Sequence, residues 1–236
     1  MDDGSTEPPP AGLTAPLAPP APRPGLGVGA AVVLGLLAVA TVWAAFAGVG
    51  PAGLDAEALA DSISARTGTL NDVALVITNI GSTWSMAVLA VLVGAWCWAR
   101  GRNADAVFVV VAMAGGALLM RGLKGWFNRP RPPVADQIQV LTNASLPSGH
   151  ATMASVVIFS LVVLAWAGRG RAARIAMVAL AVVWVGAVGV TRIYLGAHWF
   201  SDVVAGWCVG AAWLALCTAG WSWWRARRPA EARPVS

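Results

Sequence analysis

Apolar segments long enough to cross a lipid bilayer recur along this chain of 236 residues. A membrane-spanning helix needs about 20 mostly apolar residues to cross about 30 Å of hydrocarbon. Six segments meet that requirement, namely residues 26–48, 82–99, 104–123, 151–168, 174–191 and 203–224. Because a spanning segment must satisfy its own backbone polar groups, these segments are expected to be helical. The sequence therefore predicts an all-α, polytopic membrane helical bundle with six transmembrane helices.

The composition agrees with this interpretation. Apolar residues make up 58% of the chain and charged residues 11%, whereas an ordinary globular domain has about 25% charged residues. Disordered proteins, nucleic-acid-binding modules and disulfide-rich secreted scaffolds are poor fits, and the formal net charge is only +5. We therefore expect the bilayer, and no nucleic acid, as a partner. The three cysteines lie inside apolar segments and are interpreted as small buried hydrophobic residues.

Three regions differ in composition. Residues 1–24 hold eight of the fifteen prolines and are predicted to be a disordered Pro/Ala-rich tail. Residues 25–225 form the predicted membrane domain, and residues 226–236 form a basic cytoplasmic tail. Within the membrane domain, residues 54–72 are too polar to span and are interpreted as an interfacial helix or loop. The next span could begin as early as Val73, with a kink near Gly81. The first span is longer than the core of a typical signal peptide, so we expect it to be retained.

The distribution of basic residues predicts the orientation. In a six-span arrangement, ten arginines fall on one side, which the positive-inside rule makes cytoplasmic together with both termini; they are Arg23, Arg100, Arg102, Arg169, Arg171, Arg174, Arg225, Arg227, Arg228 and Arg233. The other six basic residues lie on or near the opposite face, against the topological bias; they are Arg66, Arg121, Lys124, Arg129, Arg131 and Arg192. This placement is the first indication of function.

Three short motifs contain most of the unusual polar chemistry. They are Lys124–Pro132, Pro147–His150 and Thr191–Asp202, and span number and length place all three at the same membrane face. The single lysine of the chain and both of its histidines lie within them. Such a concentration of cationic and imidazole groups indicates an anion site, and phosphate is the anion that best fits it.

Each phosphate-binding candidate has a physical reason. Lys124 offers a point charge, and Arg131 and Arg192 offer planar guanidinium groups suited to bidentate phosphate contacts. Ser148 is a good N-cap for the fourth span, whose first turn presents free N–H groups. Gly149 lets an oxyanion approach the backbone closely.

The catalytic candidates are two histidines and one aspartate. His198 and Asp202 are spaced i, i+4 and share one face if the sixth span has begun by that point. A carboxylate on one imidazole nitrogen raises the basicity of the other, which suits a nucleophile. His150 can then protonate the departing oxygen. Nothing in this scheme requires a metal, and we expect no cofactor.

Together these motifs resemble the signatures of the type 2 phosphatidic acid phosphatase superfamily. The matching patterns are Lys124-x6-Arg131-Pro132, Pro147-Ser148-Gly149-His150 and Arg192-x5-His198-x3-Asp202. The resemblance implies a metal-independent phosphatase with a phosphohistidine intermediate on His198, a general acid in His150, and an orienting carboxylate in Asp202. It also implies phosphate contacts from the remaining candidates, which are Lys124, Arg131, Ser148, Gly149 and Arg192. Thr191 departs from the usual serine but keeps a hydroxyl group.

Several alternatives remain open from the sequence. The substrate is expected to be a lipid phosphate or pyrophosphate, with candidates in undecaprenyl pyrophosphate, phosphatidic acid and phosphatidylglycerol phosphate. Undecaprenyl pyrophosphate is slightly favoured because the site is expected to face the extracytoplasmic side of the cell membrane. A phosphotransferase or a non-catalytic lipid-phosphate transporter or sensor would share much of the same pattern. Arg121 and Arg129 are interpreted as snorkelling or loop cations and are left out of the site.

Overall fold

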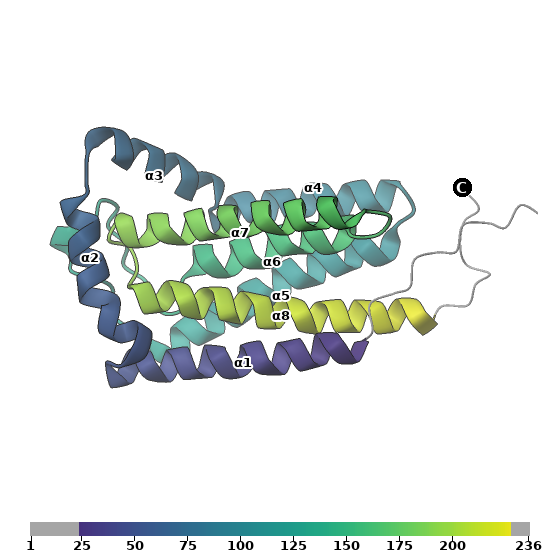
Figure 1. Cartoon of the computed structure of the whole chain (residues 1–236), viewed down its shortest axis with the longest axis horizontal. Coiled ribbons are helices and arrows are strands. Elements are labelled where there is room, and N and C mark those ends of the chain that lie inside the picture. The colour runs from purple at the N-terminus through teal and green to yellow at the C-terminus, as the bar shows by residue number, and fades with distance from the viewer. Residues whose placement is uncertain (1–23, 228–236) are drawn as a thin grey trace, which may run out of the picture.

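The computed structural model describes residues 24–227, and the regular elements in that range are helices, which confirms the all-α prediction. Helices α1 and α4 to α8 run along the long axis of the molecule, whereas α2 stands across one end (Figure 1). The α-helices are α1 (Pro24–Ala47), α2 (Asp55–Ser64), α3 (Gly68–Ile80), α4 (Thr83–Ala99), α5 (Asn103–Phe127), α6 (Gly149–Ala165), α7 (Arg171–Tyr194) and α8 (Phe200–Arg227). Two 3-10 helices, η1 (Gly50–Leu54) and η2 (Val134–Asp136), lie in the connections.

Helix α6 forms the centre of the bundle. It packs against α4, α5, α7 and α8, and most of its first three turns are buried. The main apolar core gathers around it and consists of Met86, Ala90, Phe108, Val109, Ala112, Met153, Val156, Val157 and Leu214. The side chains facing outward from the bundle are largely apolar as well, which is the pattern of a helical bundle surrounded by lipid.

Two glycines of α8 bring that helix against the backbone of α6. A Cβ atom added at Gly206 would lie 2.9 Å from the carbonyl oxygen of Ser148, and one at Gly210 would lie 2.7 Å from that of Thr152. Small residues four apart allow this kind of close helix approach. The amide of Ser148 consequently reaches the carbonyl oxygen of Asp202 at 3.0 Å. The close packing therefore places the start of α6 beside the start of α8.

The helices account for most of the predicted spans. Four are long and apolar enough to cross a bilayer, within Val28–Ala47, Asn103–Phe127, Arg171–Tyr194 and Phe200–Arg227. The pair Gly68–Ile80 and Thr83–Ala99, bent by 41°, adds a fifth if it forms one broken span. Helix α6 is apolar but has only 17 residues, which is about 25 Å of helix and short of the hydrocarbon thickness. The structure thus supports a membrane helical bundle, while the count of six spans stays a prediction.

The break between α3 and α4 falls at the predicted kink. Helix α3 ends at Ile80, and Ser82 begins α4 by accepting a hydrogen bond from the amide of Ser85 at 3.1 Å. At the break, a Cβ atom on Gly81 would lie 2.4 Å from a methyl carbon of Val188 in α7. The break therefore lets the chain pass closely over α7. The polar stretch before it is helical, as α2 and the first residues of α3.

The predicted tails fall almost wholly outside the described residues. Helix α1 begins at Pro24, the last residue assigned to the N-terminal tail, and α8 ends at Arg227, the second residue assigned to the C-terminal tail. The boundaries of the membrane domain at residues 25 and 225 stay predictions.

Candidate active site

The three motifs meet at the end of the bundle that α2 crosses. The first runs from the end of α5 into the following loop, the second forms the start of α6, and the third joins α7 to α8 (Figure 1). His198 is 2% exposed. It lies within electrostatic range of Lys124, Arg131 and Asp202. The convergence expected from span number and length is therefore present in the structure.

His198 lies in a turn and not on a helix. Helix α8 starts at Phe200, so His198 and Asp202 do not share the face of one helix as the sequence pattern suggested. The turn contains Gly196 at φ +67°, in the left-handed region that favours glycine. It still brings His198 Nδ1 to 3.5 Å from Asp202 Oδ2. The pair therefore forms by a turn that folds back onto the first turn of α8.

A serine that the sequence did not indicate lies between these two side chains. The buried Ser145 donates a short hydrogen bond from Oγ to Asp202 Oδ2, and the same oxygen is 3.3 Å from His198 Nδ1. The amide of Trp199 also donates to Asp202 Oδ2, at 3.0 Å. Asp202 thereby caps its own helix, in the manner of the acidic residue of a capping box.

Arg131 determines the tautomer of His198. Its Nη1 atom is 3.2 Å from His198 Nε2, and because a guanidinium group can only donate, Nε2 must accept. The ring proton is then on Nδ1, facing Ser145 and Asp202. The unprotonated Nε2 faces the cationic cluster, which is the arrangement that a nucleophilic imidazole requires.

Burial keeps this imidazole neutral. The pKa of His198 is lowered from 6.5 to about 3, chiefly by desolvation and also by the positive charges of Arg131 and Lys124. Asp202 opposes this effect through its hydrogen bond and its negative charge. Because the ring stays unprotonated at neutral pH, Nε2 keeps the lone pair that a nucleophile needs, which accepts from Arg131 in this structure.

The cationic side chains are anchored to the loop before α6. Lys124 Nζ donates to the carbonyl oxygens of Ala144 at 2.6 Å and Ser145 at 3.0 Å. Arg131 donates to the backbone and side-chain oxygens of Asn143, both at 2.7 Å, and also to the carbonyl oxygen of Ala197. Burial lowers the pKa of the Arg131 guanidinium. Both cations are therefore held in place next to His198.

The second motif supplies the start of α6. Ser148 is the N-cap, and its Oγ accepts from the amide of Ala151 at 3.5 Å. Gly149 is the first residue of the helix, and a Cβ atom there would meet only ordinary contacts, the nearest at 3.4 Å from Met120. His150 is half-buried, and its pKa is lowered from 6.5 to about 3, chiefly by burial. Four neighbouring groups lower this pKa as well, namely Arg192, His198, Arg131 and Lys124.

Arg192 is almost fully buried, with 2% of its surface exposed. Its Nη1 atom donates to Thr78 Oγ1 of α3 at 2.6 Å. Its Nε atom is buried and has no hydrogen-bond partner in the described part of the chain. A buried charged group normally has every donor satisfied, so an unpartnered donor on this guanidinium fits a site that binds an anion.

Arg129 and Asp55, which the sequence did not assign to the site, contact it directly. Arg129 Nη1 donates to Asp202 Oδ1 at 2.6 Å, and Arg129 Nη2 donates to Asp55 Oδ2 at 2.8 Å. Arg129 was interpreted as a loop cation, but its position against the positive-inside bias was a signal that could have found it. Asp55 and Ser145 carried no such signal. Arg121, interpreted in the same way as Arg129, is exposed on α5.

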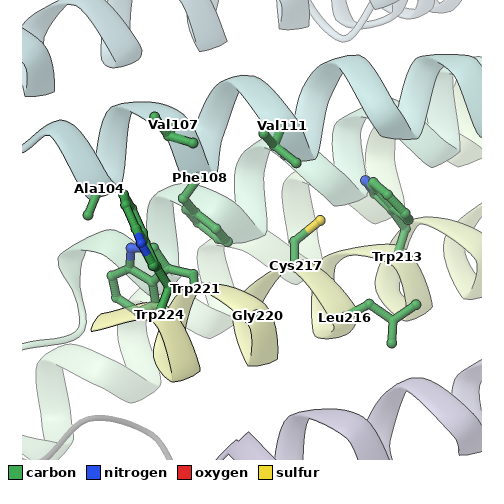
Figure 2. A pocket seen from close by; sticks show the side chains of 10 residues that line it. All are labelled: Ala104, Val107, Phe108, Val111, Trp213, Leu216, Cys217, Gly220, Trp221 and Trp224. Carbon is green, nitrogen blue, oxygen red and sulfur yellow. The ribbon is translucent and has the colours of Figure 1, made fainter. Parts of the chain in front are cut away.

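Two hollows of similar size differ in character. One of about 330 Å³ adjoins the site, in the loops that hold Arg129, Arg131 and Asn143. The other, of about 350 Å³, lies between α5 and α8, where apolar side chains point toward one another (Figure 2). It is lined by Ala104, Val107, Phe108, Val111, Trp213, Leu216, Cys217, Gly220, Trp221 and Trp224. Since this second lining includes no charged or imidazole group, the chemistry belongs to the first region.

Within residues 24–227, no group of three or more histidine, cysteine, aspartate or glutamate side chains is arranged to hold a metal ion.

Comparisons with known proteins agree with the geometry. The model of the PAP2 superfamily matches residues 105–226, just over half of the chain. Phosphatidylglycerophosphatase B of Bacillus subtilis is 29% identical over 144 residues, which are 60% of this chain and 70% of that protein. The crystal structure of a transmembrane PAP2-type phosphatidylglycerolphosphate phosphatase, also from Bacillus subtilis, matches with a TM-score of 0.71 and 24% identity. That match covers 85% of this chain and 98% of the other.

Proposed function

The chain belongs to the PAP2 superfamily and is a membrane phosphatase, and we propose that it hydrolyses a lipid phosphate through a phosphohistidine on His198. The observation that carries this proposal is the tautomer of the His198 ring and the hydrogen bonds that fix it. Its Nε2 atom accepts from Arg131, and its Nδ1 proton faces Ser145 and Asp202. No metal has a role in the proposed reaction.

The reaction has two steps. In the first, His198 Nε2 bonds to phosphorus, the bond from phosphorus to the lipid oxygen breaks, and a protonated His150 gives its proton to that oxygen. Burial and the neighbouring cations lower the pKa of His150 to about 3, so this step requires the negative charge of the bound phosphate to offset those cations and raise this pKa when substrate binds. In the second, water attacks the phosphohistidine while His150 takes a proton from it, which releases phosphate and restores His198. The phosphoryl oxygens would be held by the cationic and N-terminal groups, which are Lys124, Arg131, Ser148, Gly149 and Arg192.

The charge pattern around the site supports an extracytoplasmic position. Seven of the ten arginines assigned to the cytoplasmic side lie within the described residues, near the helix ends away from the motifs, and they are Arg100, Arg102, Arg169, Arg171, Arg174, Arg225 and Arg227. A six-span arrangement would put both termini on that side as well. We therefore propose that the protein is a multi-pass enzyme of the cell membrane and that its active site lies at the outer boundary of the bilayer. The phosphate headgroup of a membrane lipid lies at the same depth as this site, and the hydrophobic tails of that lipid would lie among the helices.

Among lipid phosphates, phosphatidylglycerol phosphate is the first substrate to test, because the similar Bacillus subtilis protein is named for it. Phosphatidic acid also ends in a phosphate monoester, whereas undecaprenyl pyrophosphate ends in a phosphoryl group bound through an anhydride and would release the lipid monophosphate. An outward-facing site also suits the recycling of a carrier lipid. The phosphate-binding groups are common to all three substrates.

The test uses the purified protein in detergent with each of the three lipids, and phosphate release is measured with and without a chelator. Release should occur from at least one lipid, should be unaffected by the chelator, and should proceed through an acid-labile, base-stable phosphoprotein. Strict dependence on a divalent cation, or binding of all three lipids without turnover, would refute the proposal. A dominant product of transfer to an added alcohol would indicate a phosphotransferase.

A further inference from the structure

Three charged side chains form a continuous network behind His198, and the network begins on a helix outside the family motifs. Asp55 belongs to α2, Arg129 to the loop after α5, and Asp202 to α8. Arg129 lies between the two carboxylates, 2.8 Å from Asp55 Oδ2 and 2.6 Å from Asp202 Oδ1. Asp55 is 6% exposed and Asp202 is fully buried.

Asp55 also holds the first turn of α8. Its Oδ1 atom accepts from the amide of Ser201 at 2.8 Å, and its Oδ2 atom accepts from the Ser201 hydroxyl at 2.8 Å. The first amides of a helix have no partner within that helix, and a carboxylate supplied by another segment can satisfy them. Asp55 therefore anchors the residue immediately before Asp202, from a position 146 residues away in the sequence.

Arg129 fixes the rotation of the Asp202 carboxylate. With Oδ1 bound to Arg129, Oδ2 is directed to the remaining partners, which are Ser145 Oγ, the amide of Trp199 and His198 Nδ1. If Arg129 moved, the carboxylate could rotate away from the ring. A displacement of about 1 Å in a catalytic group can cost about 100-fold in rate.

The charges of the network are balanced as well. One cation between two buried carboxylates leaves a net charge of −1, so Asp202 keeps its electrostatic effect on His198 while the burial of both carboxylates is compensated. Without the charge of Asp55, Arg129 would neutralise Asp202 and weaken that effect.

From these contacts we infer that Asp55 and Arg129 are positioning residues for Asp202 and that α2 is part of the catalytic apparatus. The inference rests on the proposed function, since it assumes that His198 is the nucleophile. Neither side chain needs to touch the substrate, because both act through the orientation and charge of Asp202.

The test is a kinetic comparison of Asp55→Asn and Arg129→Lys with the wild-type protein. Asp55→Asn keeps the shape of the side chain and removes its charge, whereas Arg129→Lys keeps the charge and removes the guanidinium fork that reaches both carboxylates. We expect kcat per folded enzyme to fall about 10–100-fold, as for other residues that support a catalytic group. KM and the inhibition constant of inorganic phosphate should stay within about twofold, because the phosphate-binding cations are unchanged.

Matched controls come from the same elements. Glu57→Gln removes a charge from the exposed face of α2, and Arg121→Lys changes an exposed arginine on α5. Both controls should keep wild-type kcat. The double variant Asp55→Asn/Arg129→Lys should be within about threefold of the more impaired single variant, because both changes act through one carboxylate.

A purely structural role predicts a different result. In that case the variants would melt at a lower temperature and yield less folded enzyme, but each folded molecule, counted by its phosphoenzyme in a single turnover, would keep wild-type kcat. That result, or a joint rise in KM and in the phosphate inhibition constant, would overturn the inference. If Arg129→Lys does not accumulate, Asp55→Asn alone decides the question. A wild-type protein without phosphatase activity would instead refute the proposed function.

Discussion

The two ends of the bundle each contain a buried aspartate with arginines, yet the surroundings differ. At the end away from the motifs, Asp105 contacts Arg102 at 2.7 Å and Arg225 at 3.4 Å, and these arginine side chains are 39% and 50% exposed. At the motif end, Asp202 contacts Arg129, whose side chain is only 13% exposed. The same residue types therefore form partly exposed ion pairs at one end of the bundle and a largely buried network of ion pairs at the other.

The remaining partner of each carboxylate decides what it can do. Asp105 accepts from the indole nitrogen of Trp221 at 3.1 Å, which joins α5 to α8. Asp202 instead faces His198 and Ser145. Ion pairs that involve exposed side chains contribute about 0–1 kcal/mol to stability, so we interpret Asp105 as a modest structural clamp. The comparison shows that burial and the identity of the third partner, more than the ion pair itself, separate a structural contact from a candidate catalytic one.

The largest expected effect comes from His198→Ala. Removal of the nucleophile should lower kcat for lipid phosphate release by about 10⁴-fold or more, and no phosphoenzyme should form. Phosphate release is measured in detergent, and circular dichroism verifies the fold. If the variant keeps wild-type turnover, His198 is not the nucleophile and the functional contrast between the two ends disappears.

The direct test of the comparison is a pair of matched variants, Asp202→Asn and Asp105→Asn. An amide beside a catalytic imidazole no longer supports its reactive tautomer, so Asp202→Asn should lower kcat by about 100-fold to 10⁴-fold. Asp105→Asn should keep kcat within about twofold and lower the free energy of unfolding by about 1–2 kcal/mol. Equal loss of kcat in both variants would contradict the distinction.

A smaller effect is expected in the pH dependence of stability. The pKa of His198 is lowered from 6.5 to about 3 by burial, so an unfolded chain binds a proton below pH 6.5 that the folded protein excludes. Stability from this group is therefore complete above pH 6.5 and is lost as the pH falls toward 3. The loss at pH 5 amounts to about 2 kcal/mol.

This prediction is tested by thermal or denaturant unfolding in detergent at pH 7 and pH 5. The variant His198→Asn should lose about 2 kcal/mol less than the wild-type protein between these pH values. An identical loss in both proteins would show that His198 is not held neutral by burial. The same comparison with Asp105→Asn serves as a control from the other end, and that variant should follow the wild type.

Much of the architecture follows from the amino-acid sequence. The apolar segments predict the helices because a chain in lipid must satisfy its own backbone, and each predicted span overlaps a helix in the structure. The kink at Gly81 could also be predicted from the sequence, because a glycine follows Ile80 between two apolar stretches. The motifs Lys124–Pro132, Pro147–His150 and Thr191–Asp202 identify the candidate site because rare polar residues recur there at defined spacing.

What only the tertiary structure decided is how those motifs are held together. Asp55 and Ser145 look like ordinary residues of a polar helix and a loop, and Arg129, although it lies within the first motif, has no spacing rule that connects it with Asp202. Their roles arise because Ser145 and Arg129 reach Asp202 from 57 and 73 residues away, and Asp55 reaches Ser201 from 146 residues away. Local sequence determines helices because apolar periodicity and backbone hydrogen bonding act over a few residues, whereas the partners of a buried charge depend on which distant side chains the packing of α2, α6 and α8 brings within 3 Å.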